Sequence, residues 1–202
     1  MTLSPLALWA KGKGFEKPVA QPARSYPAHD IHTDEKVGMA ADPYDVAPKS
    51  DLFPKNLIDA GFLPVFFVIS NDGDQPVSIA NVEITLITRH GSKLTPIAPD
   101  DIYRRLSNPQ ANTHPAPSPI PLPRRKVKDT VSKKEMDDIE SALFAARAVE
   151  PHNTQSGFLF FDAGGIEQPL SGASIEITRV ADSNGHELLY FELPMDKYLN
   201  AK

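Results

Sequence analysis

The stretch "HDIHTDE" contains the side-chain types that bind divalent metal ions. His29, Asp30, His32, Asp34 and Glu35 fall within seven residues. Imidazole nitrogens and carboxylate oxygens suit zinc or a similar ion, and a short loop would bring His29, His32 and Asp34 around one ion. The spacing matches no established zinc motif, and a solvated loop explains the same residues without a ligand. The sequence therefore leaves two interpretations open, a metal site at His29, His32 and Asp34 or a polar loop.

A second group of carboxylates lies in "NDGD" at residues 71–74. Calcium accepts oxygen ligands of this kind, but the regular acidic spacing and the distal glutamate of an EF-hand loop are missing. Asn, Asp and Gly also turn chains well, because they tolerate positive φ and bond to their own backbone. The composition favours a plain turn.

A basic cluster is formed by Arg124, Arg125, Lys126 and Lys128 in "RRKVK". Such a cluster can contact an anionic lipid head group, a polyanion or an acidic protein. It has no interleaved aromatic residues to stack on bases. The whole chain has a net charge of -5 and a pI near 5.7, which disfavours nucleic acid as a partner. We therefore predict a partner-binding role for these four residues, with an envelope protein or a polyanion as the partner; the alternative interpretation is a solvated patch open to proteases.

Catalytic motifs are missing from the sequence. It contains no G-x-S-x-G elbow and no glycine-rich phosphate loop. The chain has no cysteine, which excludes a disulfide framework, a zinc–thiolate site and a catalytic thiol. The adjacent acidic pairs at 100–101 and 137–138 suit helix capping and a solvated helix face. The sequence thus predicts no catalytic residue and no cofactor.

The N-terminal third of the chain is irregular in pattern. An apolar run, Leu3 to Ala10, is typical of the back half of a signal peptide, although no basic leader precedes it. We expect residues 1–10 to be the remnant of a signal peptide or, alternatively, an ordinary N-terminal tail. Frequent prolines predict an extended arm over residues 11–60, with a short edge strand at residues 36–41. No apolar run approaches the roughly 20 residues that span a bilayer.

The remaining elements follow from hydrophobic periodicity. Residues 65–69 form a continuous apolar run, which predicts a strand buried on both faces, and residues 82–87 alternate like a half-buried strand. Residues 107–131 form a proline-rich, basic loop. The capping box of Ser132 and Glu135 opens an amphipathic helix that we predict over residues 132–149.

One phrase occurs twice in the chain. "QPVSIANVEIT" at residues 75–85 aligns without a gap with "QPLSGASIEIT" at residues 168–178, and an apolar run precedes each copy. Two explanations are open. The same turn-and-strand structure could have selected similar residues twice, or the segment could have arisen by internal duplication. Either account predicts short antiparallel strands joined by turns.

The phrases "GFLPVFFVISNDGDQPVSIANVEITL" and "GFLFF...LSGASIEITRV" resemble secreted bacterial proteins with an immunoglobulin-like β-sandwich domain. The resemblance covers residues 60–98 and 150–195, and implies no catalytic residues. We therefore expect a mainly β protein. Residues 61–200 would form an antiparallel immunoglobulin-like β-sandwich with one inserted helix and the proline-rich loop.

The expected function is that of a non-enzymatic binding or structural module that is periplasmic or secreted. The alternative is a metal-binding protein or metal-dependent hydrolase that uses the His29/His32 segment.

Overall fold

The strands form two antiparallel sheets that face each other across one core. The computed structural model describes residues 15–107 and 132–202. Within these ranges each of the two main sheets has four strands. The first sheet contains, in spatial order, β1 (Ala28–His32), β2 (Val37–Pro43), β3 (Phe62–Asn71) and β8 (Asn153–Asp162). The second contains β10 (Phe191–Pro194), β9 (Ser174–Thr178), β5 (Glu83–Ile87) and β6 (Lys93–Leu94). A small ladder pairs β4 (Val77–Ser78) with β7 (Ala148–Val149).

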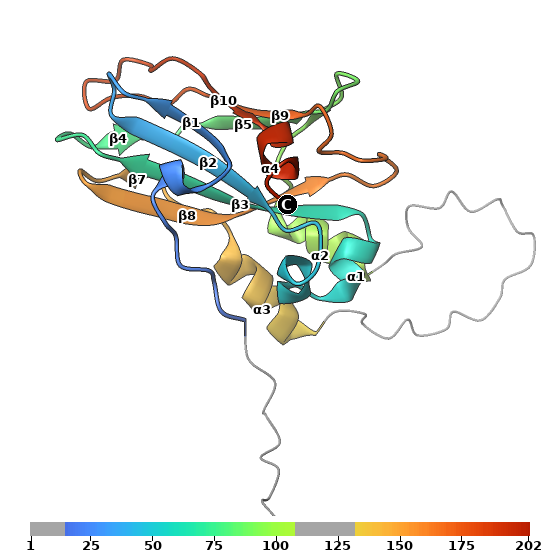
Figure 1. Cartoon of the computed structure of the whole chain (residues 1–202). Coiled ribbons are helices and arrows are strands. Elements are labelled where there is room, and N and C mark those ends of the chain that lie inside the picture. The colour runs from blue at the N-terminus through green and yellow to red at the C-terminus, as the bar shows by residue number, and fades with distance from the viewer. Residues whose placement is uncertain (1–14, 108–131) are drawn as a thin grey trace, which may run out of the picture.

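Three helices, at residues 55–59, 99–107 and 133–142, cover the outer face of the first sheet and give the protein a third layer (Figure 1). Leu57, Ile102 and Ile139 are buried there against the sheet. The C-terminal helix packs instead against the core between the sheets. The prediction of a mainly antiparallel β protein is confirmed, but the structure has more helices than the one expected. They are α1 (Lys55–Asp59), α2 (Pro99–Ser107), α3 (Lys133–Ala142) and α4 (Met195–Leu199), with short 3-10 turns η1 (Ala23–Ser25) and η2 (Lys49–Leu52).

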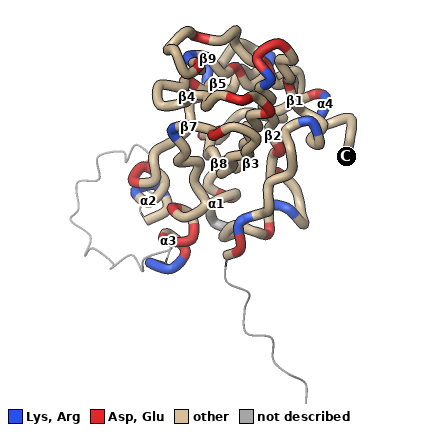
Figure 2. Tube along the Cα trace, turned by 90° about the vertical axis from the view of Figure 1, so that its left-hand side faces the viewer, with Lys and Arg blue, Asp and Glu red and all other residues tan. Residues whose placement is uncertain are grey.

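Strand β3 is buried on both faces, as its continuous apolar run predicts. Val65 and Phe67 point into the core between the two sheets, whereas Phe66 and Val68 point toward the helices. Alternate side chains of one strand thus stabilise two different layers. Strand β3 contains no charged residue and β8 contains one, Asp162 at its end, so the charged residues lie mainly on the loops, the helices and the other strands (Figure 2).

The strands of the two repeated units are neighbours in both sheets. Strand β3 pairs with β8 along ten residues, and β5 pairs with β9 along five. The repeated phrases themselves supply β5 and β9, so each copy contributes one central strand to the second sheet. The apolar runs before the phrases supply β3 and β8 in the same way.

Two expectations about the elements need correction. The segment at residues 36–41 does not lie at an edge: β2 is an inner strand between β1 and β3, and all seven of its residues are buried. The helix predicted over 132–149 begins at its capping box but ends at Ala142. The next residues leave the helix because the N–H of Phe144 donates to the carbonyl of Phe158 in β8, at 3.0 Å.

Both edges of the first sheet are occupied by other segments. Along β8, the carbonyl of Phe160 accepts from the N–H of Ile97 at 2.8 Å, beside the bond from Phe144. Along the other edge, β1 lies beside β10, where the carboxylate of Asp30 accepts from the N–H of Glu192 at 3.0 Å. Side chains and loops thus satisfy backbone groups that a bare edge would expose.

Candidate binding site

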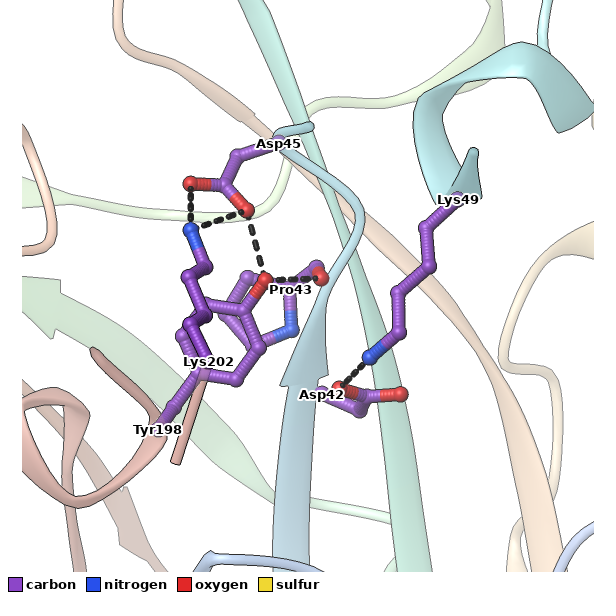
Figure 3. Close-up of polar contacts among 6 residues, drawn as sticks. All are labelled: Asp42, Pro43, Asp45, Lys49, Tyr198 and Lys202. Carbon is purple, nitrogen blue, oxygen red and sulfur yellow. Dashed lines mark hydrogen bonds and ion pairs between the residues drawn. The ribbon is translucent and has the colours of Figure 1, made fainter. Parts of the chain in front are cut away.

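Polar contacts join the C-terminal helix α4 to the end of β2 (Figure 3). The Tyr198 hydroxyl lies 2.6 Å from Oδ1 of Asp45 and 2.9 Å from the carbonyl oxygen of Pro43, and it donates toward these two acceptors. Lys202 Nζ donates to both oxygens of Asp45, at 3.1 and 2.8 Å. The Asp45 carboxylate therefore accepts from two residues of the C-terminal segment, which lie 153 and 157 residues away in the chain.

A second acidic side chain of the site is Asp42, which is 8% exposed. Its Oδ1 is 2.5 Å from Nζ of Lys49 at the start of η2. The same ammonium group lies 5.6 Å from the ring centre of Tyr44 and 5.3 Å from that of Tyr198. Lys49 is thus held by one carboxylate and two aromatic faces, an arrangement that stabilises a cation.

Local sequence explains why these residues meet at one place. Pro43 ends β2 because it has no N–H to continue the ladder, and the chain turns away through Asp45. Helix α4 directly follows β10, whose last residue, Pro194, pairs with Ser174 in β9. The end of β2 and the start of α4 are therefore fixed by the two sheets.

The environment keeps the phenols of the site protonated. Burial, and next the nearby Asp42 carboxylate, raise the pKa of Tyr44 to about 12. Burial also raises the pKa of Tyr198, and its hydrogen bond to Asp45 acts in the same direction. A phenol with a raised pKa donates hydrogen bonds at neutral pH and does not act as a base.

Two hollows flank Asp45. One has a volume of about 330 Å³, and its lining includes three polar side chains of the site, those of Asp42, Lys49 and Tyr198. The other has a volume of about 450 Å³, and both hollows have more apolar than polar surface. The lining of this second hollow, the apolar hollow, includes the side chains of Ile58, Phe62, Leu63, Ala163, Leu170 and Leu199.

The apolar hollow has the size and lining that ligand pockets usually have. The start of the second repeated phrase borders this hollow through Gln168, Pro169 and Leu170. Gln168 adopts a positive φ of 49°, a conformation that costs energy for a side chain other than glycine. The arrangement is suited to holding an apolar group next to a hydrogen-bonding rim.

The histidines that the sequence singled out do not converge. Successive residues of β1 point to opposite faces, so His29 and His32 lie on different sides of the first sheet. Asp34 lies in the exposed turn after the strand. Among the residues that the structure describes, no group of three or more His, Asp or Glu side chains is placed to hold a metal ion.

Instead, the "HDIHTDE" segment joins the two sheets. The His32 ring stacks on Phe191 of β10, with ring centres 3.8 Å apart and planes 13° from parallel. His32 Nε2 lies 3.5 Å from Asp30, whose carboxylate also accepts from β10. On the other face, the Nδ1–H of His29 donates to the carbonyl of Tyr26 at 2.5 Å. These contacts account for both histidines as structural residues.

The "NDGD" stretch forms a turn that Asn71 closes. Its Oδ1 accepts from the N–H of Gly73 at 2.9 Å, and its Nδ2 donates to the carbonyls of Gln75 and Val149 at 2.7 and 3.0 Å. The Asn71 side chain is therefore saturated by backbone groups, as expected for a structural turn.

The other sequence-based assignments lie outside the described residues. These are residues 1–10 and the basic cluster of Arg124, Arg125, Lys126 and Lys128. In the part of the chain that the structure covers, no helix has the length and apolar character needed to cross a membrane.

Sequence reasoning did not find the site around Asp45. Asp42, Asp45 and Lys49 lie in the proline-interrupted arm, and Tyr198 lies at the other end of the chain. The cluster forms only when β2 enters the sheet. No sequence signal distinguished "ADPYDVAPK" from a solvated arm, because charged residues and prolines are typical of one.

Comparisons with protein-family models, curated proteins and solved structures gave no match to this chain.

Proposed function

We propose that the chain is a non-enzymatic binding module that acts outside the cytoplasm, either periplasmic or secreted, with an envelope protein or a polyanion as its partner. The observation that carries this proposal is the apolar hollow of about 450 Å³ beside the Asp45 rim. It offers an apolar surface next to fixed polar groups, the combination that ligand and partner sites share.

The pairing of charges in the site supports binding over catalysis. Asp42 and Asp45 each have a lysine partner, and the two tyrosines keep their protons at neutral pH. A general base needs a free lone pair beside a nucleophile. Groups already engaged in ion pairs suit recognition and stability better.

Two features of the sequence support the remaining parts of the proposal. The apolar run from Leu3 to Ala10 supports export. The four basic residues of "RRKVK" offer a surface for a polyanion or an acidic protein. We also propose that the two sheets form an immunoglobulin-like sandwich, since they share one core and their central strands carry the phrases of that resemblance.

The binding proposal is tested by filling the hollow. Ala163→Trp places a large side chain into it, and Ala80→Trp makes the same change at an exposed turn. The wild-type chain and both variants are cross-linked in a periplasmic extract, after melting curves have shown that all three fold. We expect one specific adduct with wild type and Ala80→Trp that is lost with Ala163→Trp. Equal adducts in all three, or none in any, would remove the hollow as the site.

The location and the polyanion are tested separately. Cell fractionation with mass spectrometry of the N-terminus shows whether the chain is exported and cut near Lys11. Polyphosphate binding is compared between wild type and a variant with Arg124, Arg125, Lys126 and Lys128 changed to glutamine. We expect binding to wild type alone, weakening with salt. A full-length cytoplasmic protein would contradict export.

A further inference from the structure

A groove lies between the start of the described chain, η2 and α3. It has a volume of about 480 Å³. Phe53 supplies its floor and is itself fixed by edge-to-face contacts with Phe158 and Phe160, at centroid distances of 4.8 and 5.3 Å. The remaining apolar lining comes from Phe15, Leu52, Pro54 and Ile139. Phe53 is only 5% exposed, so the aromatic surface open to a ligand comes mainly from the partly exposed Phe15, which Phe53 supports at a ring-centre distance of 6.0 Å.

The rim of this groove is acidic. Among the described residues that line it, four carry a carboxylate and one, Lys134, carries a positive charge. Glu135 is used in the capping box with Ser132, where its carboxylate accepts from the N–H of Ser132 at 2.7 Å. Within the described residues, the other three carboxylates form no hydrogen bond or ion pair through their side chains. They belong to Glu16, Asp51 and Asp138.

The chain itself contains a segment of complementary chemistry. Residues 119–128, "PIPLPRRKVK", combine three prolines and a leucine with four basic residues. The segment ends four residues before Ser132, the N-cap of α3, and the first turns of α3 form one wall of the groove. An extended chain spans at most about 3.6 Å per residue, so Arg125 lies within roughly 25 Å of Ser132. Such a short tether gives an effective concentration in the millimolar range.

We propose that residues 119–128 dock in this groove, with prolines against Phe15 and with basic side chains at the acidic rim. Proline-rich segments bind aromatic grooves because they lose little conformational entropy. Arginine pairs strongly with carboxylates such as those of Asp51 and Asp138. The net negative rim favours this segment over an acidic or neutral one.

Docking also has a regulatory consequence. A basic cluster held at the rim is not free to contact an anion, so an anionic partner must compete with the groove. This competition rests on the proposed function, whereas the docking itself does not. The two can therefore fail independently.

The first test is limited digestion of the full-length chain with trypsin, which cleaves after Arg and Lys. Asp51→Asn/Asp138→Asn removes two rim charges without adding a cleavage site. Asp59→Asn/Asp137→Asn removes two exposed charges that do not line the groove. We expect cleavage at residues 124–128 to be roughly tenfold faster in the rim variant than in wild type and the control, which corresponds to about 1.4 kcal/mol of docking free energy. Equal rates in all three proteins would overturn the proposal.

The second test uses a synthetic peptide of residues 117–130. In one variant, residues 109–130 are replaced by a Gly/Ser linker of equal length, and its melting curve shows whether it folds. We expect calorimetry to detect the peptide binding to this linker variant at least tenfold more tightly than to wild type, where the groove is filled. Adding Asp51→Asn/Asp138→Asn should abolish that binding. No binding to the linker variant, or equal binding to wild type, would exclude the chain's own segment as the occupant.

Discussion

Ile84 of β5 lies directly opposite Ile177 of β9, and the two residues occupy the same position in the two repeated phrases. In the first sheet, Phe66 of β3 faces Phe158 of β8 close to the middle of the matching pair. Antiparallel pairing of equivalent strands in both sheets relates the units by an approximate two-fold rotation. This arrangement favours an internal duplication over two unrelated local solutions, since local demands alone would not pair the copies with each other.

The Ile84–Ile177 pair should contribute strongly to the free energy of unfolding, because both side chains pack into the core between the two sheets. Both side chains belong to the central core, and Ile177 is fully buried. We expect Ile177→Ala to lower the free energy of unfolding by about 2–5 kcal/mol, and Ile84→Ala by somewhat less. Because the two residues are in contact, the double variant should deviate from additivity by at least about 0.5 kcal/mol. Urea unfolding of the three variants checks this, and strictly additive values would contradict direct packing.

Gly157 permits the close approach of the segment that follows α3. A Cβ atom at this position would overlap the main chain of Phe144, which donates to Phe158. We expect Gly157→Ala to destabilise the protein by at least about 2 kcal/mol, because a backbone segment cannot yield as a side chain does. Ser156→Ala, one residue earlier, is the control and should change the unfolding free energy by less than about 0.5 kcal/mol. Similar values for both would show that the segment adapts.

The two histidines of "HDIHTDE" separate the structural interpretation from the metal-binding one. We expect His32→Ala to cost about 1–2 kcal/mol, since it removes the ring stacked on Phe191. His29→Ala should cost less than about 1 kcal/mol, through one lost hydrogen bond. Elemental analysis of untagged protein accompanies the unfolding curves. One metal ion per chain that both variants lose would instead favour the metal-binding or hydrolase alternative.

Tyr44 should make the protein less stable in alkali. Its pKa is raised to about 12 in the folded chain, above its ordinary value near 10. Between these pH values the unfolded chain has released a proton that the folded chain keeps, so the stabilisation is complete below about pH 10 and is lost as pH rises toward 12. The loss is on the order of 2 kcal/mol. Urea unfolding across this range should show a steeper decline for wild type than for Tyr44→Phe, and parallel curves would refute the shift.

The contact between α4 and β2 depends on the Tyr198 hydroxyl more than on Lys202. Tyr198→Phe leaves the Pro43 carbonyl without its donor and removes one of the two donors to Oδ1 of Asp45, which should cost about 1–3 kcal/mol. Lys202 is partly exposed, so Lys202→Ala should cost less than about 1 kcal/mol. Thermal melts give the order of the two effects. The reverse order would mean that the ion pair dominates.

Hydrophobic pattern predicted the central strands well, because their side-chain periodicity reflects burial directly. The run at 65–69 lies within β3, and the run at 82–87 overlaps β5. The capping box correctly marked the start of α3. The end of α3 was not predictable, since pairing of Phe144 with β8 overrides a pattern that continues as a helix. Strand β2 was underestimated because small residues and prolines give a weak strand signal. Asp45 and Tyr198 meet only through tertiary structure.

The occupied edges of the first sheet determine how this protein behaves when it is crowded. Because the carbonyls of Phe158 and Phe160 in β8 already accept from Phe144 and Ile97, and β10 lies beside β1, an incoming extended chain finds part of each edge covered. Growth of fibrils by strand addition therefore first requires these covering segments to detach. The protein should stay monodisperse at high concentration, and amyloid formation through this sheet should begin only under conditions that open one of these covering segments.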